Sequence, residues 1–203
     1  MSRKSLAAGL RRRYLSLRKK LGPVFIRREN DRIVASLTGI LRQTRFQGLC
    51  LYKSVCNEPD PAGLARIFGD RRIYYPRVRG DLLEFVEAGT EKNFSRSGFG
   101  IPEPCGGRIL SEQVFQKPNS VVVFVVPGVV FDRTGGRIGF GKGYYDRSLD
   151  LMAKAAGSRI VRIGIAWDFQ VRLDPLPLGK RDVRMDMIVT RKKVRKCIRT
   201  GRL

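Results

Sequence analysis

Histidine is absent from the 203-residue sequence, and cysteine is scarce. Without histidine, a Ser-His or Cys-His nucleophile and a histidine general base are excluded. No two cysteines form a C-x-x-C pair, so a zinc site is not expected either. Any chemistry must therefore use lysine, arginine, aspartate, glutamate, tyrosine, backbone amides or a bound metal. The four cysteines are Cys50, Cys56, Cys105 and Cys197.

Long apolar runs are also lacking. No stretch approaches the roughly 20 residues of a membrane-spanning helix, so no association with a membrane is expected. The first residues, MSRKSLAAGLRRR, are positively charged but include no apolar segment or cleavage site, which predicts a cytoplasmic protein without a signal peptide. The length predicts one domain over residues 1–203, with a basic tail from about residue 191.

Acidic residues are missing from one end of the chain and few at the other. Residues 1–28 carry ten Lys or Arg and no acid, and residues 180–203 carry ten against two acids. The net charge is +23, but the middle of the chain carries 21 basic and 16 acidic residues. Basic ends can bind nucleic acid through its phosphates, or attract polyanionic small molecules. No RNA-recognition motif, zinc finger or arginine-glycine repeat supports the first reading.

Apolar periodicity predicts helices at the start of the chain. In the segment 4–21 the apolar positions recur at spacings of three and four, which predicts one apolar stripe under a basic face. These positions are Leu6, Leu10, Tyr14, Leu17 and Leu21. The same period resumes over residues 24–43.

The pattern of residues 48–89 predicts short strands and one short helix. Residues 48–52 form an apolar run that predicts a buried strand. Asp60 as N-cap and Pro61 at the first helical position predict the start of a short helix. The segments 71–76 and 81–89 are strand candidates.

The second half alternates strands and helices. Residues 91–111 are rich in Gly, Ser and Pro and predict a long loop. The strongest strand is 120–128, continuously apolar and β-branched as in the buried centre of a parallel sheet. A helix over about 143–156 and strands at 159–167 and 185–190 follow. This order predicts an α/β fold: a three-layer α/β/α sandwich with a mostly parallel central sheet.

A glycine-rich turn, GGRIGFGKGYYD (135–146), follows the strongest strand. It approaches a phosphate-binding loop from Gly136 to Lys142, but Gly143 stands where Ser or Thr would hold magnesium. Glycine amides and the start of the next helix favour an anion, so a nucleotide-phosphate loop of another kind is expected. Asp146 could hold magnesium in place of the missing hydroxyl, or form an i,i+4 ion pair with Lys142.

The string VPGVVFDRTGGRIGFGKGYYDR (126–147) resembles the hallmark of the 5-formyltetrahydrofolate cyclo-ligase family, V-P-G-x-x-F-D-x-x-G-x-R-[LI]-G-x-G-x-G-Y-Y-D. Further segments resemble the family in the same order, over residues 7 to 190. They are Arg11 in the N-terminal helix, Glu58 in YKSVCNEPD, YYPRV at 74–78, GIPEP at 100–104 and Asp182 in LDPLPLGKRDVRMDMIVT.

The resemblance implies an enzyme with a CoA-transferase-like fold that uses ATP and Mg²⁺. It would convert 5-formyltetrahydrofolate, free or polyglutamylated, to 5,10-methenyltetrahydrofolate with release of ADP and phosphate, and a monomer is expected. Lys142 and Arg137 would be catalytic, and Asp146 and Asp182 would hold the metal. The implied ATP-binding residues are Lys4, Arg11, Arg137, Ile138, Gly139, Phe140, Gly141, Lys142, Gly143, Tyr144 and Tyr145. The implied folate-binding residues are Glu58, Phe99, Phe140, Gly141, Lys142, Gly143 and Tyr144.

Two positions depart from the family pattern. The family's first lysine falls at Ala7, and Lys4, one turn earlier, is expected to replace it. Phe99 stands where the family often carries tryptophan.

Simpler structural roles remain open for some of these residues. Glu58 could be a solvated loop acid, and Phe99 could pack on the core. Asp182 could pair with a neighbouring surface base, and one of Tyr144 and Tyr145 is expected to pack in the core. For the whole chain, the alternatives are a nucleic-acid-binding protein that retains the fold, or a different ATP-dependent enzyme.

Overall fold

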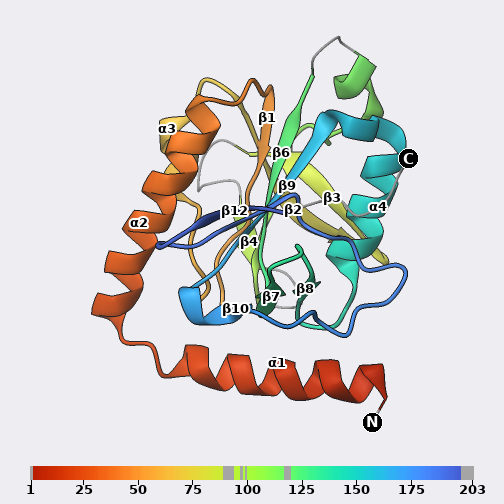
Figure 1. Cartoon of the computed structure of the whole chain (residues 1–203). Helices are drawn as coiled ribbons and strands as arrows, with labels where there is room; N and C mark the ends of the chain where they lie inside the picture. Colours follow the sequence, from red (N-terminus) through yellow and green to blue (C-terminus); the bar gives the residue numbers. More distant parts are fainter. Residues whose placement is uncertain (1, 89–93, 97, 99, 117–119, 198–203) are drawn as a thin grey trace.

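The computed structural model describes residues 2–88, 94–96, 98, 100–116 and 120–197 (Figure 1). Four α-helices and three short 3₁₀ helices occur in these residues. The α-helices are α1 (Arg3–Lys19), α2 (Pro23–Arg42), α3 (Gly63–Ile67) and α4 (Tyr144–Ala156). The 3₁₀ helices are η2 (Glu112–Gln116), η3 (Gly157–Arg159) and η4 (Asp168–Gln170). None of the helices in the described residues is long and apolar enough to cross a membrane.

A seven-stranded sheet has the order β12-β11-β9-β6-β1-β2-β3. The inner pairs β11–β9, β9–β6, β6–β1 and β1–β2 are parallel, whereas both edge strands pair antiparallel. The strands are β1 (Gly48–Cys50), β2 (Arg72–Arg79), β3 (Leu82–Glu87), β6 (Val122–Val126), β9 (Ile160–Ile165), β11 (Met187–Val189) and β12 (Val194–Lys196). The predicted mostly parallel sheet is confirmed, with β6 at its centre.

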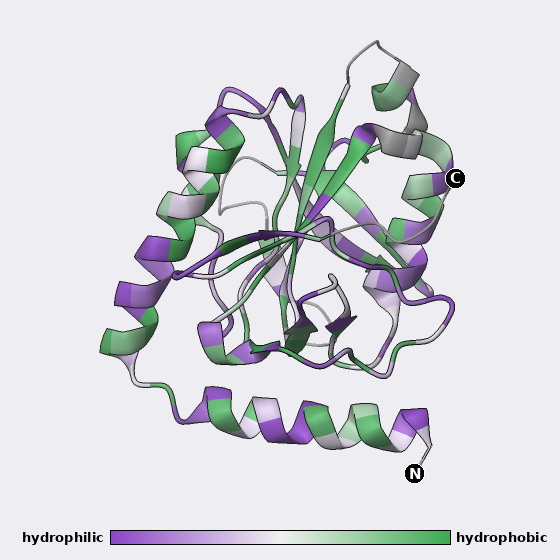
Figure 2. Ribbon diagram, viewed as in Figure 1, coloured by the Kyte–Doolittle hydropathy of each residue, from purple (hydrophilic) through white to green (hydrophobic). Residues whose placement is uncertain are grey.

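Alternating side chains of the inner strands form two cores. Val123 and Val125 of β6 face a cluster that includes Leu37 of α2, while Phe124 faces a second cluster that includes Leu149 of α4. Because successive strand residues point to opposite faces, a wholly apolar strand must be covered on both. Figure 1 shows α2 and α3 on one side of the sheet and α4 on the other, and Figure 2 shows the apolar central strands between these helices. The three-layer α/β/α prediction is confirmed.

Helix α1 lies across one end of the sheet, and its buried face differs from the predicted stripe (Figure 1). Leu6 and Leu17 are 43% and 39% exposed, so including them in the stripe was wrong. Tyr14 is buried as predicted and packs against Val129, and the fully buried residue one turn later is Arg18. Helical spacing predicted that one face of α1 is buried. That face includes Arg18, because the guanidinium finds hydrogen-bond acceptors at the Cys56 and Gly128 carbonyls.

Two sequence expectations about loops need correction. The predicted loop 91–111 includes a small antiparallel pair, β4 (Phe94–Arg96) with β5 (Pro102–Pro104). The glycine turn does not follow β6 directly, because β7 (Val130–Asp132) and β8 (Arg137–Ile138) intervene and join β10 (Val171–Arg172) in a second sheet. The basic tail from about residue 191 includes β12, which pairs with β11.

The short helix near residue 60 begins later than predicted. The N-cap of α3 is Ala62, not Asp60, although the Asp60 carboxylate accepts a hydrogen bond from the Ala62 amide at 3.0 Å. Asp60 therefore fixes the turn before α3 instead of capping the helix itself.

Asp132 fixes the turn between β7 and β8. Its buried carboxylate accepts hydrogen bonds from the amides of Thr134, Gly136 and Leu176 at 2.8, 2.9 and 2.8 Å, and from the Thr134 hydroxyl at 2.7 Å. Burial acts to raise the pKa of Asp132, but these hydrogen bonds outweigh burial and hold the pKa below its ordinary value. The turn that leads into the glycine-rich loop thus depends on an ionised carboxylate.

Asp132→Ala is expected to lower the free energy of unfolding by about 2–4 kcal/mol at neutral pH, because four donors lose their acceptor. A carboxylate whose folded pKa is depressed stabilises the protein above its unfolded pKa of about 3.9, and this stabilisation is lost as the pH falls through the folded value. Denaturant unfolding at several pH values should show the difference shrinking in acid. Asp174→Ala, at a carboxylate that is 77% exposed, should change stability by less than about 0.5 kcal/mol.

Candidate active site

A cavity of about 800 Å³ opens where the chain leaves the carboxyl ends of β1 and β6. Its wall combines the start of α1, the segment after β1, the glycine-rich loop and residues 177–179 with Asp182. This edge of a parallel sheet is where α/β folds bind ligands. Every described residue that the sequence placed in the site lines this cavity; Phe99 lies outside the described residues.

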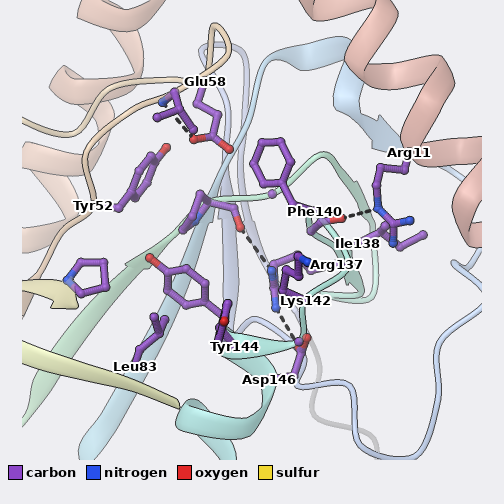
Figure 3. Close-up of a pocket in the computed structure, with 18 of the residues that line it drawn as sticks. Arg11, Tyr52, Glu58, Leu83, Arg137, Ile138, Phe140, Lys142, Tyr144 and Asp146 are labelled. Carbon is purple, nitrogen blue, oxygen red and sulfur yellow. Dashed lines mark hydrogen bonds and ion pairs between the residues drawn. The ribbon is translucent and has the colours of Figure 1, made fainter. Parts of the chain in front are cut away.

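The glycine-rich loop, residues 139–143, connects β8 to α4. Gly141 and Gly143 have φ angles of +98° and +71°, which only glycine adopts readily, and Gly143 is the N-cap of α4. Arg11 of α1 donates from Nε to the Gly139 carbonyl at 2.8 Å, so the first helix supports this loop (Figure 3). Such a turn before a helix favours an anion.

Charged and aromatic side chains surround this loop. Lys142 is exposed, and no hydrogen bond or ion pair of its amino group with another described residue is seen. Phe140 is 45% exposed in the cavity wall. Arg3 and Lys4 line the same cavity from α1, one turn before Ala7. Part of the positive charge at the N-terminal end of the chain therefore faces the cavity, which suits a polyanionic small molecule.

Arg137 is buried beneath the loop and binds Asp146. Its Nη2 donates to Asp146 Oδ1 at 2.7 Å, and its Nη1 donates to the Pro127 carbonyl at 3.4 Å (Figure 3). The Asp146–Lys142 ion pair considered from the sequence is therefore wrong: the partner of Asp146 is Arg137. The buried Arg137 Nε has no hydrogen-bond partner in the described chain, which leaves a donor available beside the cavity.

Glu58 lies on the opposite wall of the cavity, close to Tyr52 (Figure 3). Its side chain is 2% exposed and pairs with Arg18 Nη1 at 3.4 Å, so it is not a solvated loop acid. Burial raises the pKa of Glu58 to about 7, although Arg18, the Val55 amide and Arg137 each act to lower it. Glu58 can therefore gain or lose a proton near neutrality.

The two aspartates assigned to metal both line the cavity. Asp146 also accepts from the Val183 amide at 3.3 Å, and Asp182 accepts from the Gly179 amide at 2.5 Å. The surface ion pair considered for Asp182 is not found among the described residues. No group of three His, Cys, Asp or Glu in the described residues could hold a metal alone. One or two carboxylates together with phosphate oxygens are a usual Mg²⁺ environment, so this pair fits Mg²⁺ that arrives with a nucleotide.

Both tyrosines at the start of α4 pack partly against the core, not only one of them. Burial, and then the charge of Glu58, raise the pKa of Tyr145 well above its ordinary value. The Arg147 guanidinium lies 5.3 Å from the centre of the Tyr144 ring. Ile138 is buried against Tyr14 of α1, so its side chain supports the loop from below.

The sequence did not single out Arg18, Tyr52 or Gln170. Tyr52 donates to the Pro59 carbonyl at 2.5 Å, and Gln170 donates to the Gly128 and Val129 carbonyls at 3.1 and 2.7 Å. A signal for Arg18 did exist: it follows Arg11 by seven residues, which places both on one helical face. Among ten basic residues in 28, that signal was hidden.

Gly141→Ala is expected to lower the free energy of unfolding by about 1–2 kcal/mol, since alanine resists a φ of +98°. The new methyl carbon would also lie 3.0 Å from the Arg11 guanidinium carbon. Gly39→Ala, within α2 and with open space around it, should instead raise stability by about 0.5–1 kcal/mol. Denaturant unfolding of both variants measures this difference in stability. If both substitutions change the free energy of unfolding equally, the loop does not require the positive φ angle of Gly141.

Comparison with known proteins gives one consistent result. The model of the 5-formyltetrahydrofolate cyclo-ligase family matches residues 3–191. A probable 5-formyltetrahydrofolate cyclo-ligase of Schizosaccharomyces pombe is 27% identical over 164 residues, which cover 74% of this chain and 78% of that protein.

Two solved structures are also similar. The 5,10-methenyltetrahydrofolate synthetase of Aquifex aeolicus matches with a TM-score of 0.78 and 29% identity, covering 98% of this chain and 95% of that one. The synthetase of Mycoplasma pneumoniae matches with a TM-score of 0.69 and 25% identity, covering 91% and 98%. The chain belongs to the 5-formyltetrahydrofolate cyclo-ligase family.

Proposed function

We propose that this protein uses ATP and Mg²⁺ to convert 5-formyltetrahydrofolate to 5,10-methenyltetrahydrofolate, with release of ADP and phosphate. The observation that carries the proposal is the cavity itself. On one wall it has a glycine loop with cationic side chains, and on the other a buried carboxylate. An anion-binding wall facing a hydrogen-bonding carboxylate suits two substrates, a nucleotide and a pterin, held side by side. Family membership over residues 3–191 supports the same reaction.

The chemistry requires little from protein acids and bases. The formyl oxygen is a poor leaving group until the γ-phosphoryl group of ATP is transferred to it, with release of ADP. The neighbouring folate amine then attacks the formyl carbon and gives up its proton, the carbon–oxygen bond breaks, and phosphate departs with that proton. Both steps depend on positioning and on stabilised phosphoryl charge, which suits a chain without histidine.

The residues of this chain take the following roles in the proposal. The amides of residues 139–143, Lys142 and Arg11 hold the triphosphate, with Lys4 beside them in place of the family lysine that falls at Ala7. Arg137, whose Nε lacks a partner in the described residues, stabilises the charge of the transferred group. Bound Mg²⁺, held by Asp146 and Asp182, would neutralise phosphate charge. Phe140 and Tyr144 line the folate face, and Glu58 accepts hydrogen bonds from the pterin.

A single assay tests the function. Turnover of 5-formyltetrahydrofolate with ATP and Mg²⁺ should produce the near-ultraviolet absorbance of the methenyl product, and omission of ATP should abolish it. ATP consumption without use of the folate would favour a different ATP-dependent enzyme. RNA affinity that falls steeply with salt, without ring closure, would favour the nucleic-acid alternative.

Lys142→Ala is expected to lower kcat at least about 100-fold, because a preorganised cation next to the transferred phosphoryl group is lost. The exposed position of Lys142 means that the circular dichroism spectrum should not change. Lys154→Ala, an exposed lysine of α4 paired with Asp150 and outside the cavity, should keep the activity. Undiminished ring closure by Lys142→Ala would refute the role given to this lysine.

Glu58→Gln is expected to raise the KM for the folate about tenfold, because a hydrogen bond to a carboxylate becomes one to a neutral amide. With a pKa of about 7, the wild-type carboxylate ionises as the pH rises, so the wild-type KM should fall through neutrality. The Gln variant should lose that dependence. Glu84→Gln, on β3 outside the cavity, should leave the KM profile as in the wild type.

A further inference from the structure

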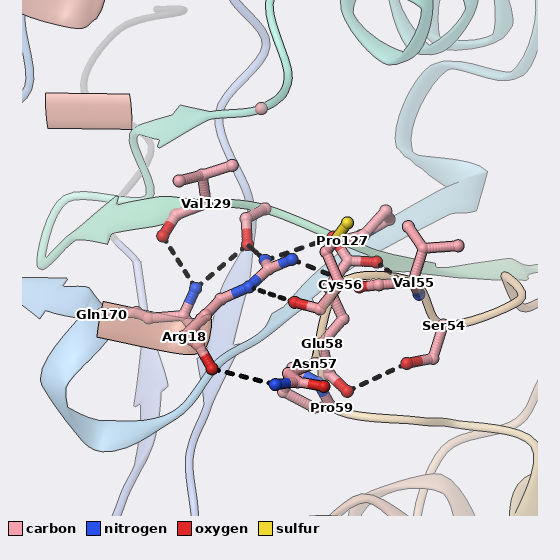
Figure 4. Close-up of polar contacts among 12 residues, drawn as sticks. Arg18, Ser54, Val55, Cys56, Asn57, Glu58, Pro59, Pro127, Val129 and Gln170 are labelled. Carbon is pink, nitrogen blue, oxygen red and sulfur yellow. Dashed lines mark hydrogen bonds and ion pairs between the residues drawn. The ribbon is translucent and has the colours of Figure 1, made fainter. Parts of the chain in front are cut away.

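Arg18 connects three parts of the molecule through one guanidinium group (Figure 4). Its Nε donates to the Cys56 carbonyl at 2.9 Å, and its Nη2 donates to the Val55 carbonyl at 3.2 Å. Its Nη1 reaches the Gly128 carbonyl at 3.3 Å and Glu58 Oε1 at 3.4 Å. One side chain of α1 thus contacts the segment after β1, the end of β6 and the carboxylate in the cavity wall.

The burial of Arg18 is unusual for this residue type. Its side chain is 0% exposed, although nine other basic residues in the first 28 could reach water. A buried guanidinium is tolerated only where its donors find acceptors, and here carbonyl oxygens supply most of them. Among the described residues, the one carboxylate that Arg18 contacts is that of Glu58.

The segment that meets Arg18 has a strained backbone. Cys56 and Asn57 have φ angles of +50° and +56°, a region that residues with side chains rarely adopt. The strained turn is held by Asn57, whose side chain donates to the Arg18 carbonyl at 3.0 Å, and by Ser54, whose hydroxyl donates to the Glu58 carbonyl at 2.9 Å. Strain maintained by surrounding hydrogen bonds is common where a side chain must be aimed at a ligand. Here the aimed side chain is Glu58.

We propose that Arg18 is the positioning residue of the folate subsite: it favours the ionised form of the Glu58 carboxylate and directs it into the cavity. This role rests on the function proposed above, because Glu58 is the group that would meet the pterin. Arg18 also lies 5.7 Å from the centre of the Phe140 ring. The guanidinium therefore contacts Phe140 of the glycine-rich loop as well as the Glu58 carboxylate.

Among the described residues, Arg18 is the cation that forms an ion pair with Glu58. Burial raises the pKa of Glu58 to about 7, and the Arg18 charge is the largest influence in the opposite direction. Arg137 of β8 acts in the same direction as Arg18, but more weakly. Tyr52 and Tyr145 also face Glu58, and burial keeps both neutral by raising their own pKa values. Loss of Arg18 should therefore raise the pKa of Glu58 further, so that less of it is ionised at neutral pH.

The first experiment measures the folate KM of Arg18→Met across the pH range. A rise of about one unit in the pKa of Glu58 lowers its ionised fraction about fivefold near pH 7 and only slightly near pH 9. The KM should therefore rise about fivefold near neutrality and return close to the wild-type value in base. A KM increase of equal size at both pH values would overturn the proposal, because lost packing does not titrate.

The second experiment titrates Glu58 directly, by carbon NMR of protein labelled at the glutamate carboxyl carbon and assigned with Glu58→Gln. Arg18→Met should move the Glu58 titration about one unit or more toward base. Arg18→Lys keeps the charge but loses the planar fork, so it should move the titration less. If the Met variant does not fold, Arg18→Gln, which keeps side-chain donors but lacks the charge, carries the test, and an unchanged Glu58 titration would overturn the proposal.

Gln170→Met is the matched control. Gln170 is fully buried and donates to the same Gly128 carbonyl as Arg18, but no contact between it and Glu58 is seen in the described chain. The Gln170→Met variant should titrate Glu58 at the wild-type pH. A shift in the Glu58 titration as large as that of Arg18→Met would contradict a specific role of Arg18. If the wild-type enzyme does not close the folate ring, the proposed function fails, while the NMR titration still decides the role of Arg18.

Discussion

Two carbonyl groups at the end of the central strand organise the site. The strand β6 is buried on both faces, and the chain leaves it at Pro127 and Gly128 with carbonyl oxygens that need donors. Arg137 donates to the first of these carbonyls, and Arg18 donates to the second. Each guanidinium then has donors left for a carboxylate in the cavity wall. The backbone at the end of β6 therefore determines where the acidic groups of the site lie.

In the proposed function, this arrangement gives the two carboxylates different tasks. Asp146 pairs with Arg137 at 2.7 Å and is close to the glycine-rich loop, and the proposal assigns it to Mg²⁺ that phosphate oxygens also hold. Glu58 pairs with Arg18 over a longer distance, 3.4 Å, and its burial raises its pKa to about 7. A site built from arginine, lysine and carboxylates can hold a polyanion and a pterin without histidine. Helix α1 supports both halves, since Arg11 binds the loop and Arg18 binds Glu58.

The sequence predicted the features that depend on local pattern. The apolar strand became the centre of the sheet because a run of β-branched residues must be covered on both faces. The glycine-rich loop could be predicted because only glycine adopts the φ angles that Gly141 and Gly143 show. Long-range pairings could not be predicted. Asp146 pairs with Arg137 and not with Lys142, although Lys142 is nearer in sequence. The reason is that β8 places the Arg137 guanidinium beneath the start of α4. The burial of Arg18 could not be predicted either, because its hydrogen-bond partners are remote in sequence.

The proposed function requires that the loop of residues 139–143 hold the terminal phosphates of a nucleotide while Glu58 holds a pterin in the same cavity. A crystal structure with Mg²⁺, a non-hydrolysable ATP analogue and 5-formyltetrahydrofolate tests it most directly. We expect the γ-phosphate to contact the loop amides and Lys142, with the formyl oxygen next to it and the pterin bonded to Glu58. A nucleotide bound elsewhere, with Lys142 directed into bulk solvent, would rule out this role of the loop.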